Sequence, residues 1–156
     1  MTLERKYRYR RRLPHIQADA PLVIDFVTCR RWILPERARD VVFECCLYEN
    51  GRKADLIAAV VMPDHVHLLL KPARNADGWH YSLPEIMGSL KSAAAHKINR
   101  ALSRKGPVWQ EEFFDHALRA SEPLSGAVEY IRNNPVKAGL VSRPKDYRWL
   151  FVADGY

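Results

Sequence analysis

The chain has 156 residues, of which 47% are hydrophobic and 28% are charged. This length suits one domain, and the mixture is typical of a soluble globular fold rather than a disordered or collagen-like chain. No apolar run approaches the length of a membrane-spanning helix, and the first twelve residues lack the apolar stretch of a secretory signal. The three cysteines, two of them adjacent, favour a reducing compartment. We therefore expect a cytoplasmic protein with no membrane partner.

The positive charge is concentrated in two segments. Lys and Arg number 25 and Asp and Glu 18, which gives a net charge of +7. Residues 1–12 hold six basic residues and one acidic residue, and residues 86–110 hold five basic residues and no acidic one. Such segments on a near-neutral body favour a polyanionic partner, most simply nucleic acid, although a solvated face and a plain tail would give the same pattern.

Residues 1–20 are predicted to form a basic N-terminal arm, in which arginines are interleaved with tyrosines. Cationic and aromatic side chains in such a mixture can grip phosphates and stack on bases. Residues 21–150 would then form the folded domain, and residues 151–156 a C-terminal tail. The side chains of the arm that we expect to contact DNA are Arg5, Lys6, Arg8, Arg10, Arg11 and Arg12.

The first half of the predicted domain reads as strand, helix, strand, strand. A β-branched and aromatic run over 22–30 predicts the first strand, and apolar residues at helical spacing over 35–50 predict a helix. The apolar run 56–62 and the segment 65–71 predict two further strands. The turn signal Pro63-Asp64 lies between them, so these two strands are expected to form a hairpin.

A second helix is predicted to follow Ser82. Ser82 and Glu85 form the capping-box pattern of a helix start, and apolar residues then recur at helical spacing as far as Leu102. Basic residues are expected to line one flank of this helix, where they could contact the phosphates of DNA. The residues predicted to do so are Lys97, Arg100 and Arg104.

Residues 107–116 predict a fourth strand, and residues 121–133 a third helix that ends at Asn134-Pro135, because the residue before a proline disfavours the helical conformation. Residues 136–156 are expected to be irregular, with aromatic anchors. The resulting β-α-β-β-α-β-α order is typical of an α+β, ferredoxin-like sandwich, an antiparallel sheet of four or five strands with helices on one face. That scaffold serves many unrelated functions, so function has to be argued from particular residues.

Two histidines in the third predicted strand are candidate metal ligands. His65 and His67 are separated by one residue, so the alternation of a strand places both imidazoles on the same face. Two such imidazoles can hold one divalent cation. A pair of surface or hydrogen-bonded histidines would show the same pattern.

Tyr130 and Asn134 lie four residues apart in the third predicted helix, and therefore on one side of it. A phenol at this position could act as a nucleophile, and an amide oxygen one turn later could be a third metal ligand. The alternatives are a tyrosine that packs its ring at the rim of the core and a polar residue at the end of a helix.

Three segments together carry a family resemblance. They read VVMPDHVHLLLKP over 60–72, VWQEEFFDHALR over 108–119 and EYIRNNPVKAGLV over 129–141. They resemble the single-tyrosine HUH transposases of insertion sequences, and most closely the REP-associated tyrosine transposases. In that name HUH denotes two histidines around a hydrophobic residue, here His65-Val66-His67. The similarity spans roughly residues 20–150.

The resemblance implies roles for the candidate residues. His65, His67 and Asn134 would hold a divalent cation, Mg²⁺ or Mn²⁺, and Tyr130 would be the catalytic nucleophile. Members of the family cut single-stranded DNA beside hairpins, in this branch REP-type palindromes, and keep the broken end as a 5′-phosphotyrosine before rejoining strands.

The expected partner is therefore a single-stranded DNA hairpin at the bacterial nucleoid. Monomer and homodimer both stay open, because a flexible connection to the third helix could deliver Tyr130 to either subunit. The main alternative function is that of a domesticated, non-catalytic binder of structured single-stranded DNA or RNA.

Overall fold

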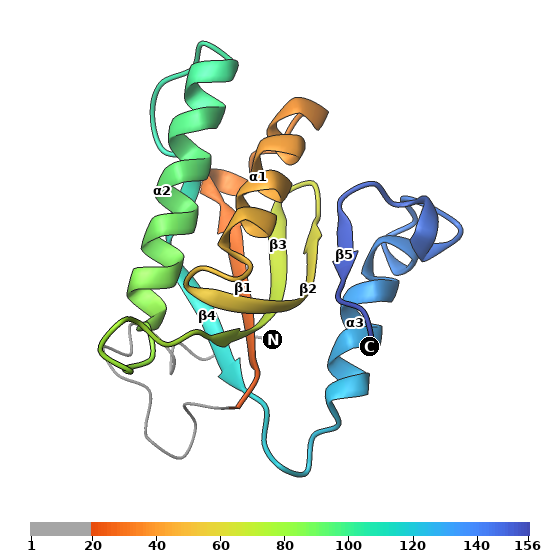
Figure 1. Ribbon diagram of the computed structural model, residues 1–156. Coiled ribbons are helices and arrows are strands. Elements are labelled where there is room, and N and C mark those ends of the chain that lie inside the picture. The colour runs from red at the N-terminus through yellow and green to blue at the C-terminus, as the bar shows by residue number, and fades with distance from the viewer. Residues whose placement is uncertain (1–19) are drawn as a thin grey trace.

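The computed structural model describes residues 20–156, which form one five-stranded sheet and three α-helices (Figure 1). The predicted α+β class and element order are confirmed. None of the helices in this part of the chain is long and apolar enough to cross a bilayer. In chain order the elements are β1 (Leu22–Thr28), α1 (Glu36–Glu49), β2 (Ala54–Val61), β3 (His65–Pro72), α2 (Leu83–Ala101), β4 (Trp109–Ala117), α3 (Leu124–Lys137) and β5 (Leu150–Val152).

The sheet is antiparallel throughout, with the strand order β4-β1-β3-β2-β5. Its first four strands have the ferredoxin-like arrangement that the sequence predicted, and β5 adds a short fifth strand beside β2. The β2–β3 hairpin is also as predicted. Every residue of β3 from Val66 to Leu70 is buried, because this central strand has neighbours on both edges and cover on both faces.

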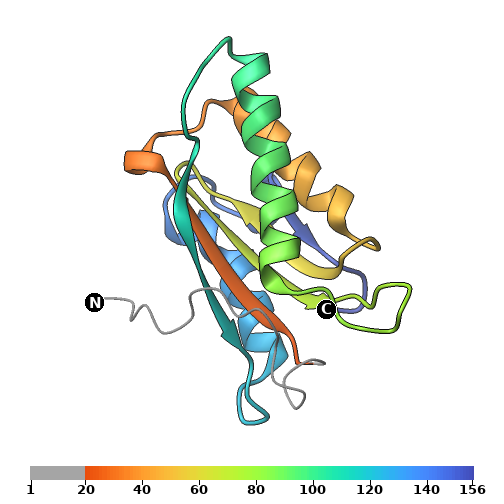
Figure 2. The ribbon, with the colours of Figure 1, turned by 90° about the vertical axis from the view of Figure 1, so that its left-hand side faces the viewer.

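The helices lie on both faces of the sheet, and not on one face as predicted. Figure 2 shows α1 and α2 together on one side and α3 on the other. Leu68 and Leu70 of β3 pack toward Ile86 of α2, whereas His67, which points the opposite way, meets α3. This second face also carries buried apolar residues, Leu69 of β3 and Ala58 and Val60 of β2, so it needs a cover, and α3 supplies it.

The start of α2 confirms the capping pattern in the sequence. The Ser82 hydroxyl accepts a hydrogen bond from the Glu85 amide at 3.2 Å, and the Glu85 carboxylate accepts one from the Ser82 amide at 2.9 Å. The apolar stripe of the helix is buried against the sheet and α1. It consists of Leu83, Ile86, Met87, Leu90, Ala94 and Ile98.

Two details of the C-terminal third correct the sequence prediction. Helix α3 does not end at Asn134-Pro135 but continues to Lys137, because Pro135 is buried in the core and tertiary packing overrides the local preference. Residues 136–156 are not irregular throughout, since Leu150–Val152 pair with Ala58–Val60 of β2 as strand β5. This strand includes the first residues of the segment that was expected to be a tail.

Two aromatic anchors hold this C-terminal segment against β2. Tyr147 and Trp149 are both buried, and the Tyr147 hydroxyl donates a 2.5 Å hydrogen bond to the carbonyl of Val61. The Trp149 ring nitrogen donates to the Asp40 carboxylate of α1 at 2.8 Å. Their role as anchors was predicted, and their contacts explain why so short a strand stays paired.

Candidate active site

The face of the sheet covered by α3 brings together two histidines and a tyrosine. The alternation of β3 directs His65 and His67 to this face, where their rings lie edge to face with centroids 4.7 Å apart. The ring of Tyr130, from the middle of α3, lies edge to face with His67 at 5.6 Å. Tyr130 is 53% exposed, so a nucleophilic phenol here would be reachable from solvent.

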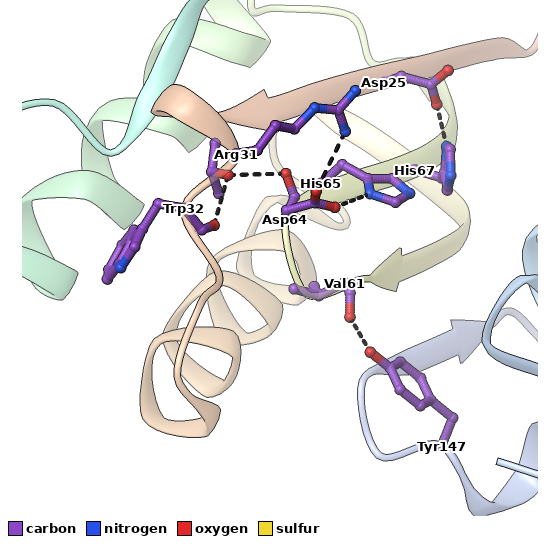
Figure 3. A network of polar contacts seen from close by, with 9 residues as sticks. Asp25, Arg31, Trp32, Val61, Asp64, His65, His67 and Tyr147 are labelled. Carbon is purple, nitrogen blue, oxygen red and sulfur yellow. Dashed lines mark hydrogen bonds and ion pairs between the residues drawn. The ribbon is translucent and has the colours of Figure 1, made fainter. Parts of the chain in front are cut away.

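Each histidine has a carboxylate on its Nδ1 atom (Figure 3). Asp64 Oδ1 is 2.6 Å from His65 Nδ1, and Asp25 of β1 bonds His67 Nδ1 from the position directly opposite in the sheet register. Because an ionised carboxylate only accepts hydrogen bonds, each Nδ1 carries the proton. In the neutral ring the lone pair is then on Nε2, which is the atom free to bind a metal.

The surroundings of His65 favour the neutral imidazole. Burial lowers the pKa of His65 from its ordinary value, and this effect outweighs the opposing hydrogen bond to Asp64. Burial would raise the pKa of Asp64, but its bonds to His65 and Arg31 dominate, so the pKa of that carboxyl is lowered. At neutral pH the pair is therefore an imidazole beside a carboxylate, the state of histidine that ligates metals.

The donor set in this region fits a divalent cation. Among residues 20–156 no group of three or more His, Cys, Asp or Glu side chains could hold a metal by itself. The third predicted ligand, Asn134, is half-buried one helical turn after Tyr130. Its helix α3 contacts β3, the strand that carries both histidines, and no hydrogen bond between described residues joins Asn134 to either of them.

The predicted basic residues are not all near this site. Lys97 and Arg100 are exposed on α2, and the sheet separates that helix from α3, the helix that contains Tyr130 (Figure 2). Arg104 lies beyond the end of α2, not on its flank. Its guanidinium donates to Asn99 Oδ1 at 2.8 Å and packs over the ring of Trp32. The six basic arm residues between Arg5 and Arg12 fall outside the described part of the chain.

Two residues at the site were missed by sequence reasoning. Asp25 is the only charged residue in the strand LVIDFVT, and a lone charge in an apolar strand could have marked it as a candidate site residue. Its partner His67, however, is determined by the pairing register of β1 and β3, which the sequence does not reveal. Arg31 forms an ion pair with Asp64, its Nη1 3.5 Å from Oδ2. Arg31 lies in a short turn directly after β1, and no pattern in the sequence indicates that this turn is close to the histidines.

Comparison with known proteins identifies the family. Residues 24–134 match the family described as "Transposase IS200 like". The chain belongs to this family. The resemblance found in the sequence is thereby confirmed, and the match includes both histidines, Tyr130 and Asn134.

Individual relatives agree with the family assignment. The REP-associated tyrosine transposase of Escherichia coli K12 is 29% identical over 99 residues, covering 64% of this chain and 54% of that protein. A Haemophilus influenzae protein named for the same group is 30% identical over 98 residues, covering 60% of this chain and 56% of its own length. The matched regions thus span little more than half of these curated relatives.

A solved structure shares the fold. It is described as a REP-associated tyrosine transposase bound to a REP hairpin, and it superposes with a TM-score of 0.62 over 96% of this chain and 82% of the other. The sequence identity is 21%, so this likeness concerns the arrangement of the sheet and helices. The IS200-like chain therefore has the architecture of a transposase in the same named group.

Proposed function

We propose that this IS200-like protein is a metal-dependent single-stranded DNA transposase, which nicks next to hairpins of the REP type and rejoins strands through a phosphotyrosine. The observation that carries the proposal is the approach of Tyr130 to His67, which forms with His65 an imidazole pair backed by two carboxylates. A phenol beside a preorganised pair of metal ligands is the arrangement needed for attack on a phosphodiester.

Tyr130 is the proposed nucleophile. Its phenolic oxygen attacks the phosphorus, the bond from phosphorus to the 3′ oxygen breaks, and the leaving 3′ oxygen takes up a proton as a hydroxyl. The phenolic proton is released, so the 5′ end remains on Tyr130 as a phosphate diester. Another 3′-hydroxyl can reverse the same exchange, which joins strands without ATP because one diester replaces another.

His65, His67 and Asn134 would hold the cation, Mg²⁺ or Mn²⁺. When bound, it supplies charge withdrawal from the scissile phosphate and favours the phenolate over the phenol. The chain's own contribution is orientation: Asp64 and Asp25 hold the two rings with Nε2 available, and α3 holds Tyr130 against His67. All three proposed ligands are neutral, a set that favours Mn²⁺ over Mg²⁺.

Several features support a single-stranded substrate. Tyr130 is exposed on α3 beside His67, and an open pocket next to it is lined by residues of β1, β4, α3 and the loop that joins the last two. A flexible strand could enter this region, whereas a stacked duplex is less able to present phosphorus in line with the phenol. The basic N-terminal arm and Lys97 and Arg100 would bind the remaining phosphates, in the cytoplasm and at the nucleoid, as a monomer or a homodimer.

The test is covalent capture on a denaturing gel. The protein is incubated with Mn²⁺ and labelled single strands that carry a palindromic hairpin with flanks on both sides. We expect a slower DNA–protein band that disappears in Tyr130→Phe, in His65→Ala and after chelation. Tyr48→Phe is the matched control, because Tyr48 is a similarly exposed helical tyrosine on α1, across the sheet. Its band should persist.

Other outcomes would contradict this proposal in different ways. Cleavage without a covalent band would indicate a hydrolase that uses water. Binding that survives chelation and Tyr130→Phe, with no cleavage of any strand in a broad hairpin pool, would favour the non-catalytic binder of structured nucleic acid.

A further inference from the structure

The turn after β1 holds two arginines in an unfavourable backbone conformation. Arg30 and Arg31 have φ values of 54° and 56°, in the left-handed region that a Cβ atom disfavours. The described chain places glycine at five other left-handed positions, and the only further exception is Ser103. Glycine would relieve the strain at 30 and 31, so both arginines occupy these positions against the local backbone preference.

Tertiary hydrogen bonds force this conformation on the turn. The Thr28 amide donates to the carbonyl of Asp64 at 2.9 Å, and the Thr28 hydroxyl spans the turn, 2.7 Å from the carbonyl of Trp32 and 3.1 Å from that of Asp64. The Leu34 amide donates to the carbonyl of Pro63 at 2.7 Å. The turn is thus fastened on both sides to the loop that precedes His65. Strained residues held in this way concentrate at functional sites.

The Arg31 guanidinium lies at the edge of the histidine pair (Figure 3). Its side chain is 63% exposed, and one nitrogen pairs with Asp64 at 3.5 Å, while the other Asp64 oxygen holds His65. An exposed pair at this distance contributes little to stability, so Arg31 can turn to another anion at small cost. Its remaining N–H donors suit a phosphate, which a guanidinium can bind in a bidentate manner.

We propose that Arg31, presented by the strained Arg30–Arg31 turn, binds a backbone phosphate of the single strand that flanks the hairpin and positions this strand over the histidine pair. This inference rests on the proposed function. The single-stranded flank is favoured over the duplex stem because Arg31 is tied through Asp64 to His65, where the scissile phosphate would lie. The effect of Arg31 on binding should therefore depend on the flank.

The test measures binding without cleavage. All variants carry Tyr130→Phe and are titrated in EDTA against a fluorescent hairpin with single-stranded flanks and against the same hairpin without them. Affinity falls with salt concentration, and loss of one phosphate contact on a single strand makes the slope of log affinity against log salt shallower by about 0.7. If affinities are equal at 1 M salt, this corresponds to about fivefold weaker binding at 0.1 M salt. We expect both effects for Arg31→Ala with the flanked hairpin only, and partial rescue by Arg31→Lys.

Arg31→Gly separates the side chain from the backbone strain. It should bind the flanked hairpin as weakly as Arg31→Ala while its melting temperature stays at or above that of the parent, because glycine adopts the left-handed conformation without strain. Arg52→Ala is the matched control. Arg52 is an exposed arginine just before β2, at the end of the β2–β3 hairpin opposite Asp64, and its removal should leave affinity and salt slope unchanged.

The outcomes distinguish this inference from the function on which it rests. If the parent binds the flanked hairpin and the Arg31 variants match it in affinity and slope, the phosphate contact is refuted and the proposed function stands. An equal loss with the flankless hairpin refutes the assignment to the single strand. If the parent binds neither hairpin, the proposed function fails and this inference fails with it.

Discussion

Replacement of Asp25 tests whether the carboxylates behind the histidines prepare the site for a cation. Asp25 bonds the Nδ1 atom of His67, a residue that is only 7% exposed. In Asp25→Asn the amide oxygen can still accept this hydrogen bond, but the charge is gone. A bond to a charged group contributes about 1.5–3 kcal/mol and a neutral one about 0.5–1.5 kcal/mol. Because this bond is present before the cation binds, only its strengthening on binding affects affinity, so the difference of about 1 kcal/mol predicts at most roughly fivefold weaker binding of Mn²⁺.

Asp25→Ala should have a larger effect, because it removes the acceptor altogether. The buried N–H of His67 then lacks a protein partner, and the ring is free to take the other tautomer, in which Nε2 carries the proton. Loss of such a partner behind a metal ligand weakens metal affinity by about 10- to 100-fold. Since the Asp25 side chain is 32% exposed, water can replace part of the interaction, and we expect the lower half of this range.

The assay is Mn²⁺ titration followed by electron paramagnetic resonance, with nitrogen chemical shifts of His67 to report its tautomer. Asp55→Asn is the control, because Asp55 is an exposed strand aspartate near the far end of the β2–β3 hairpin. Circular dichroism would verify folding. The reasoning is refuted if a folded Asp25→Ala protein binds Mn²⁺ within twofold of the parent and His67 keeps the same tautomer.

Two further predictions concern the packing of α3 and the charge of a partly buried lysine on α2. Ile131 of α3 is completely buried next to Tyr130, so Ile131→Ala should lower the free energy of unfolding by about 2–5 kcal/mol in urea titration, and a change below 0.5 kcal/mol would show that α3 is not held by this residue. Burial lowers the pKa of Lys91 to about 8, against a smaller opposing effect of Glu111. Between this value and the ordinary lysine pKa the unfolded chain binds more protons than the native one, so stability should rise with pH above 8. Lys91→Met should remove that rise, and an unchanged pH profile of unfolding would contradict the assignment.

Local patterns in the sequence were enough to predict most of the elements. The capping box that starts α2 requires only Ser82 and Glu85, so it can be recognised locally. The β2–β3 hairpin can be predicted from two apolar runs on either side of Pro63-Asp64. Strand β5 could not be predicted in the same way, because three residues are too few to show an alternating pattern. It forms because Tyr147 and Trp149 pin the segment beside the free edge of β2.

The side of the sheet on which α3 packs was also beyond the sequence pattern. An amphipathic stripe shows which side of a helix is buried, but not which face of the sheet that side will cover. In α3 the buried residues are Val128, Ile131 and Pro135. The choice matters for the site, because the same helix on the other face would place Tyr130 with α1 and α2 and leave His65 and His67 without it.

The sequence by itself determined which chemical groups are available and which of them share a face, because a strand alternates every two residues and a helix repeats every three or four. That is why the imidazole pair and the spacing of Tyr130 and Asn134 could be recognised at once. Only the tertiary structure decided which groups meet across elements. The register of β1 against β3 sets Asp25 behind His67, and hydrogen bonds between two turns bring Arg31 to Asp64. These contacts join residues more than 30 positions apart, and such pairings depend on how the whole sheet closes rather than on any local pattern.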